Sequence, residues 1–179
     1  MCTLSVDAFN GEPTRRLISF SINIGHQSIT MDRGRTYIVY EKRVEGTGRM
    51  ACRLGEMGSR VLTVTRLHPG LLAERIGMDA EESIWLSERA GPRNIPPDQL
   101  NRLFQGISAF LSENPDGIVM LEGVEYLLLY NEVKKVLATV ERINDVVMSS
   151  QAVLVISVDP LTLDPRTLAY LRRWAEVVE

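Results

Sequence analysis

Two nearly all-apolar segments, separated by a long amphipathic stretch, constrain the fold of this chain more than any other feature. Residues 118–121 read Ile-Val-Met-Leu, and residues 152–158 read Ala-Val-Leu-Val-Ile-Ser-Val. Strands without alternation of polar and apolar positions are buried on both faces of a sheet. Between them, apolar residues recur at helical spacing from Glu125 to Met148. A buried strand, a helix and a second buried strand predict a parallel sheet with helices on both faces.

The same alternation of strand and helix runs through residues 35–179, which we predict to form one three-layer α/β/α domain with a mainly parallel, five-stranded sheet. The expected strands are 36–41, 61–65, 83–86, 118–121 and 152–158. The expected helices are 46–57, 69–77, one starting at Pro96-Pro97-Asp98, 125–148 and one starting at Asp164-Pro165. Asp before Pro is a strong helix start, because the carboxylate caps free N–H groups and Pro fits the first turn.

Two helices carry apolar stripes that we expect to face the core. In helix 125–148 the stripe consists of Leu129, Val133, Val136, Val140, Ile143 and Val147. In the last helix it consists of Leu168, Leu171 and Ala175. Both stripes follow the 3.6-residue period of a helix with one buried face.

Residues 1–34 have a different rhythm and predict a separate N-terminal β extension. Polar and apolar residues alternate at 4–8 and again at 18–25, and Asn10-Gly11 supplies a turn between them. Ile29 and Met31 indicate a third strand that ends at Asp32-Arg33-Gly34. We predict a small antiparallel β-hairpin or meander.

Composition excludes several classes of function. Among the 179 residues, 20 Lys and Arg stand against 23 Asp and Glu, for a net charge of −3. Such a chain is not expected to bind nucleic acid or an anionic membrane surface through general positive charge. The first residues lack a secretory signal, the apolar runs are shorter than a membrane span, and there are only two Cys. We therefore expect a cytoplasmic protein with reduced thiols.

The segment after the first core strand is the place to look for a phosphate-binding loop. Residues 45–50 read Glu-Gly-Thr-Gly-Arg-Met, which resembles the end of such a loop. The upstream glycine is replaced by Arg43, Arg49 stands where Lys belongs, and Met50 stands where a Mg²⁺-binding hydroxyl belongs. A glycine-flanked loop leading into a helix is the plainer interpretation. In the alternative, Gly46, Gly48 and Arg49 hold phosphates.

Two acidic residues follow the apolar strand 118–121. Glu122 stands at the end of the strand, where α/β proteins bind ligands, and Glu125 comes three residues later. The plainer role for either is to cap the following helix and meet its positive end. In the alternative, Glu122 or Glu125 holds the Mg²⁺ of a bound nucleotide.

Several short strings together resemble a known family. They are Tyr37-Ile38-Val39, Val64-Thr65-Arg66, Trp85-Leu86-Ser87, residues 119–127 (Val-Met-Leu-Glu-Gly-Val-Glu-Tyr-Leu) and residues 155–160 (Val-Ile-Ser-Val-Asp-Pro). With these strings, residues 36–175 resemble the archaeal family catalogued as domain of unknown function 835.

The resemblance implies a RecA/KaiC-like ATPase fold that has lost its phosphate loop, often joined to signalling domains. It implies a strand order of 5-1-4-3-2, with the Glu122 strand beside the first core strand, and it implies no catalytic residues. Family members usually carry Asp where Glu122 stands, and the longer side chain weakens a role in metal binding.

Two functions follow from these observations. The leading hypothesis is a non-catalytic signalling or assembly module without a cofactor, because no intact catalytic motif is present. It would act on a protein partner or by self-association as an oligomer, with the N-terminal β extension as the expected contact. The alternative is a nucleotide-binding protein or slow ATPase that holds ATP and Mg²⁺ with a nonstandard loop.

Overall fold

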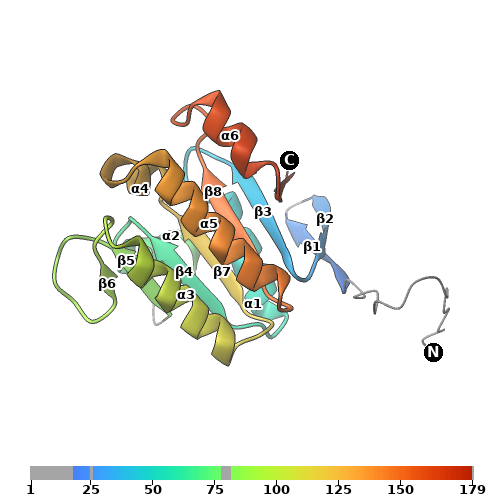
Figure 1. Ribbon diagram of the computed structural model, residues 1–179. Coiled ribbons are helices and arrows are strands. Elements are labelled where there is room, and N and C mark those ends of the chain that lie inside the picture. Colours follow the sequence, from blue (N-terminus) through green and yellow to red (C-terminus); the bar gives the residue numbers. More distant parts are fainter. Residues whose placement is uncertain (1–17, 25, 78–81, 179) are drawn as a thin grey trace, which may run out of the picture.

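The computed structural model describes residues 18–24, 26–77 and 82–178, in which one parallel sheet lies between two layers (Figure 1). Its strands are β3 (Arg35–Tyr40), β4 (Val61–Thr65), β5 (Ser83–Leu86), β6 (Asn94–Ile95), β7 (Ile118–Glu122), β8 (Val153–Val158) and β9 (Ala175–Val178). Their order across the sheet is β6-β5-β4-β7-β8-β3-β9, and neighbouring strands are parallel throughout. Every residue of β7 and β8 is buried, which confirms the prediction from their apolar sequences.

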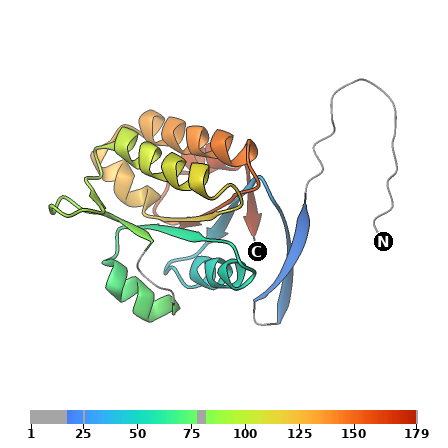
Figure 2. The same cartoon turned by 90° about the horizontal axis from the view of Figure 1, so that it is seen from below.

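The helices divide between the two faces according to the direction in which the chain travels. α1 (Gly46–Glu56) and α2 (Pro69–Ile76) lie on one face, and α3 (Leu100–Glu113), α5 (Val133–Met148) and α6 (Pro165–Leu171) lie on the other (Figures 1 and 2). The first two connections run toward β6 and the last three toward β9, so right-handed crossovers place their helices on opposite faces. No helix of the described residues is long and apolar enough to cross a membrane.

The predicted strand order was wrong. The Glu122 strand, β7, pairs with β4 on one side and β8 on the other, and β8 separates it from the first core strand, β3. Local patterns identify the strands, but each strand would be equally buried in several central positions. The pairing therefore depends on contacts far apart in the sequence.

Two edge strands were not predicted, so the sheet has seven strands instead of five. β6 has only two residues, which is too few for a periodic signal. Ala175, which we assigned to the stripe of the last helix, lies in β9 because α6 ends at Leu171. The expected start of that helix is confirmed: Asp164 Oδ1 accepts hydrogen bonds from the backbone N–H groups of Arg166 and Thr167 at 3.0 Å.

The long helix predicted over 125–148 is interrupted. α4 (Val124–Tyr130) ends at Asn131, whose backbone is extended and whose side-chain amide donates to Pro97 O at 2.8 Å and Leu127 O at 2.9 Å. As a result, Leu129 and Val133 are exposed instead of buried. The rest of the predicted stripe, from Val136 to Val147, is buried as expected.

A two-stranded antiparallel hairpin extends the α1 layer of the molecule (Figure 2). β1 (Ser19–Ile24) pairs with β2 (Gln27–Asp32), which confirms the later part of the predicted extension, while its first strand at 4–8 lies outside the described residues. Ile22 and Met31 are buried in one cluster with Met50 and Leu54 of α1. The hairpin therefore covers part of the sheet in the way a third helix would.

Truncating Met31 tests whether the hairpin belongs to the core. The side chain is 1% exposed, so Met31→Ala is expected to lower the free energy of unfolding by about 2–5 kcal/mol. Thr30→Ala is the control, because Thr30 is exposed on the same strand and its loss is expected to cost under about 1 kcal/mol. Urea unfolding measures both. Equal small losses would show that the hairpin does not contribute to the core.

Candidate functional site

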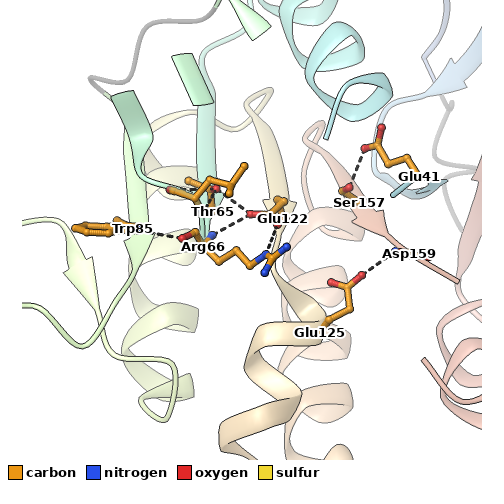
Figure 3. A network of polar contacts seen from close by, with 9 residues as sticks. Glu41, Thr65, Arg66, Trp85, Glu122, Glu125, Ser157 and Asp159 are labelled. Atoms are coloured by element: carbon orange, nitrogen blue, oxygen red, sulfur yellow. Dashed lines mark hydrogen bonds and ion pairs between the residues drawn. The ribbon is translucent and has the colours of Figure 1, made fainter. Parts of the chain in front are cut away.

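The carboxyl edge of the sheet has two places where neighbouring strands send the chain to opposite faces. From β4 and β3 the chain goes to α2 and α1, whereas from the adjacent strands β7 and β8 it goes to the α5 and α6 layer. Such switch points are where open α/β sheets bind ligands. Polar side chains gather along this edge (Figure 3).

The carboxylate of Glu41 occupies the beginning of α1. Its Oε2 accepts from the N–H of Gly46 at 2.6 Å, and its Oε1 accepts from the N–H of Thr47 at 3.2 Å and from the Thr47 hydroxyl. The Ser157 hydroxyl of β8 also donates to Oε1, at 2.8 Å. The first N–H groups of a helix have no partner within the helix and attract anions. Here the chain supplies the anion itself.

The three residues that would hold phosphates in the alternative interpretation have different surroundings. The Gly46 N–H is the one bound by Glu41, and the Arg49 side chain is exposed. Gly48 is buried and faces α2: an added Cβ would lie 2.4 Å from Cγ2 of Ile76. The structure explains Gly48 by this close approach of the two helices.

Glu122 bridges β7 and β4 at the first switch point (Figure 3). Its Oε2 accepts from the Thr65 hydroxyl and the Arg66 N–H, both at 2.9 Å, and its Oε1 accepts from Nε of Arg66 at 3.0 Å. The residue is only 8% exposed. The indole N–H of Trp85 donates to Arg66 O at 3.1 Å and so fixes the same segment. Glu122 therefore holds the end of β4 against β7.

Glu125 lies in the first turn of α4, and its Oε1 accepts from the Asp159 N–H at 2.7 Å. Burial raises the pKa of the Glu125 carboxyl, against the lowering effect of this hydrogen bond, and the nearby Glu122 charge raises it further. Gly123 is the cap residue of α4 and has no side-chain hydrogen bond, so neither glutamate stands at the cap position itself. Glu125 meets the positive end of the helix as expected, because it lies in the first turn and its carboxylate also accepts from its own backbone N–H. Glu122 instead binds the end of β4.

The structure aligns these residues along one edge but does not join the predicted set into one pocket. Glu122 of β7 is in register with Ser157 of β8, which donates to Glu41 just after β3, and Glu125 follows Glu122 in the first turn of α4. The three carboxylates therefore lie along one edge of the sheet. Sequence reasoning missed Glu41, although its position at the end of the first core strand could have indicated it. Among the described residues, no group of three or more His, Cys, Asp or Glu could hold a metal ion.

The Cys52 thiol and the His68 imidazole each bind a backbone group at an end of α2. The Cys52 thiol donates to Ile76 O at 3.1 Å, and burial raises its pKa, which disfavours the nucleophilic thiolate. Nδ1 of His68 accepts from the Gly70 N–H at 3.2 Å. These contacts fix the ends of α2.

Comparison with known proteins places the chain in a family. Residues 41–174 match the model of a family described as protein of unknown function, DUF835. The chain belongs to this family. No curated protein matches the chain. The DUF835 match confirms the resemblance found in the sequence, while the archaeal origin and the relation to KaiC stay predictions.

The buried Glu125 predicts a specific dependence of stability on pH. A raised pKa in the folded state means that the protonated carboxyl stabilises the fold below the ordinary Glu pKa, and that this contribution is lost as pH rises through the raised pKa. Gln imitates the protonated form and can still accept from the Asp159 N–H. We therefore expect the free energy of unfolding of Glu125→Gln, relative to wild type, to rise between pH 4 and neutral pH. Urea unfolding at each pH measures it.

Glu132→Gln is the matched control. Hydrogen bonding to Lys135 lowers the pKa of exposed Glu132, so this variant should lose stability relative to wild type over the same range, and weakly because the pair is exposed. If the difference in free energy of unfolding between Glu125→Gln and wild type does not change with pH, the raised pKa of Glu125 is contradicted.

Proposed function

We propose that this DUF835 protein is a non-catalytic signalling or assembly module that acts by binding protein. One observation carries the proposal: at both switch points, the carboxylates that could hold a ligand or metal accept hydrogen bonds from the chain itself. A ligand at these atoms would have to displace Gly46, Arg66 or Asp159 from their partners. The alternative, a nucleotide-binding protein or slow ATPase, stays a prediction that these contacts do not favour.

Exposed apolar side chains supply a surface for a protein partner. We define the α4–α6 surface by five of them, with their exposed fractions: Leu129 (79%), Tyr130 (41%), Val133 (45%), Leu161 (91%) and Tyr170 (42%). They belong to α4, the start of α5, and α6 with the loop before it, which lie at one end of one face (Figure 1). Clustered apolar residues on a soluble domain mark contact sites.

A groove between α5 and α6 lies within this surface. It has a volume of about 600 Å³, and its apolar lining includes Val133, Leu137 and Tyr170. Four charged residues also line it: Lys134, Arg166, Glu141 and Asp164. Two positive and two negative charges fit a protein surface better than a polyanion, and they let the groove pair with its own copy across a two-fold axis. A second copy of this chain is therefore the proposed partner.

The N-terminal extension has a different role in its described part. Ile22 and Met31 pack into the core of their own chain, so their apolar faces are not available to a partner. Pairing through residues 1–17 lies outside the described residues and stays a prediction.

A charge placed on the α4–α6 surface tests the proposal. Wild-type protein is expected to show the mass of a dimer or larger assembly by light scattering at micromolar concentration, and Val133→Glu is expected to show the monomer mass, because a buried unpaired charge opposes association. Leu71→Glu is the control, since Leu71 is 55% exposed on α2, on the other face. A wild-type monomer, or an unchanged mass for Val133→Glu, would contradict self-association through this surface.

A further inference from the structure

A second cavity, on the opposite face of the sheet, collects positive charge. It has a volume of about 440 Å³ and is lined by Arg43, Val44, Glu45, Arg49, Arg75 and Ile76. Arg43 precedes α1, Arg49 lies in its first turns, and Arg75 lies in the last turn of α2. We call this the arginine cavity. It shares no residue with the groove between α5 and α6.

Packing of α2 on α1 brings the three arginines together. Ile76 lies directly against Gly48, where there is no room for a Cβ, and Ile76 O accepts from the Cys52 thiol of α1. Ile76 also packs on a buried cluster that contains Val44 and Leu72. The end of α2, which carries Arg75, is therefore held beside the start of α1, which carries Arg49.

The guanidinium groups of these arginines have no hydrogen bond or ion pair within the described part of the chain. The ion pairs found there are Arg53–Glu56, Arg60–Glu82, Arg66–Glu122 and Lys135–Glu132. Of the residues that the structure describes, Glu45 is the one carboxylate that lines the cavity, so three positive charges face one negative charge there. The chain as a whole is negative, at −3, so this excess is local. Like charges around one cavity repel each other, and an anion between them removes that cost.

We propose that the arginine cavity binds a phosphate monoester. The excess of two positive charges matches the charge of about −1.5 to −2 on a phosphate monoester at neutral pH. Arginine presents forked N–H donors that pair with phosphate oxygens two at a time, and three such groups match the three terminal oxygens. A volume of 440 Å³ lies in the range of small-molecule sites, roughly 300–1,000 Å³, and leaves room for the esterified group.

This site is independent of the α1 N–H groups and of the proposed self-association. Glu41 already occupies the N–H groups of Gly46 and Thr47, so the cavity depends on side chains alone. Its lining residues belong to α1, α2 and the segment before α1, and these helices lie on the face of the sheet opposite to α5 and α6 (Figure 2). A negative result for phosphate binding therefore does not affect the proposed self-association, and a negative result for self-association does not affect phosphate binding.

Titration calorimetry of the full chain at low ionic strength tests the site with two probes: inorganic phosphate and a short peptide containing phosphoserine, with the unphosphorylated peptide as blank. Wild-type protein is expected to bind a phosphorylated probe and not the blank. Arg43→Ala, Arg49→Ala and Arg75→Ala are each expected to weaken binding at least about tenfold, because each removes charge-assisted hydrogen bonds. These side chains are exposed, and circular dichroism melts check that the variants fold.

Arg172→Ala is the matched control, an exposed arginine at the end of α6, and it should leave binding within about twofold. Arg75→Lys should bind more weakly than wild type, because it keeps the charge but loses the fork. Tighter binding of the phosphorylated peptide than of inorganic phosphate would support the monoester, whereas equal or weaker binding of the peptide would overturn it in favour of free phosphate. No saturable binding of either probe, or equal weakening by Arg172→Ala, would overturn the proposal.

Discussion

The contact between the Glu41 carboxylate and the start of α1 organises the edge of the sheet where a ligand would be expected. One side chain from the end of β3 satisfies two N–H groups of the helix, takes the Thr47 hydroxyl and accepts from Ser157 on the neighbouring strand. It therefore ties β3, β8 and α1 together. Without an anion these N–H groups would lack partners, and a buried donor without a partner costs about 1–3 kcal/mol.

The other two carboxylates at this edge of the sheet also accept hydrogen bonds from their own chain. Glu122 binds the end of β4 through Thr65 and Arg66, and Glu125 binds the loop after β8 through the Asp159 N–H (Figure 3). The switch points of this sheet thus serve to hold loops. Because the carboxylates at this edge bind the chain itself, we place the contact with a protein partner on the outer faces of the helices. This is the basis of the proposed role as an interaction module.

The sequence predicts the elements of this protein better than their arrangement. The apolar runs of β7 and β8, the alternation in β1 and β2, and the Asp164-Pro165 helix start are local patterns, and the structure confirms them. The strand order, the two-residue β6 and the break at Asn131 depend on partners outside the local window. Asn131, for example, ends α4 partly by donating to Pro97, 34 residues away.

In the candidate site, too, the sequence predicts local features but not the contacts between distant residues. The sequence places Glu122 and Glu125 at a strand end and so identifies the edge correctly. It does not show that Thr65 and Arg66 come from a neighbouring strand, because the predicted order was wrong. Glu41 was missed because one of its donors, Ser157, lies 116 residues away and no short motif joins them.

Hydrogen exchange at the first N–H groups of α1 tests the central claim most directly. Because these groups have no partner within the helix, protection of Gly46 and Thr47 depends on Glu41. Exchange measured by NMR is expected to be slow at both positions in the wild-type protein and fast in Glu41→Ala, with the N–H groups at the centre of β8 unchanged as the internal control. Fast exchange at Gly46 and Thr47 in the wild type, or protection that persists in Glu41→Ala, would contradict the account.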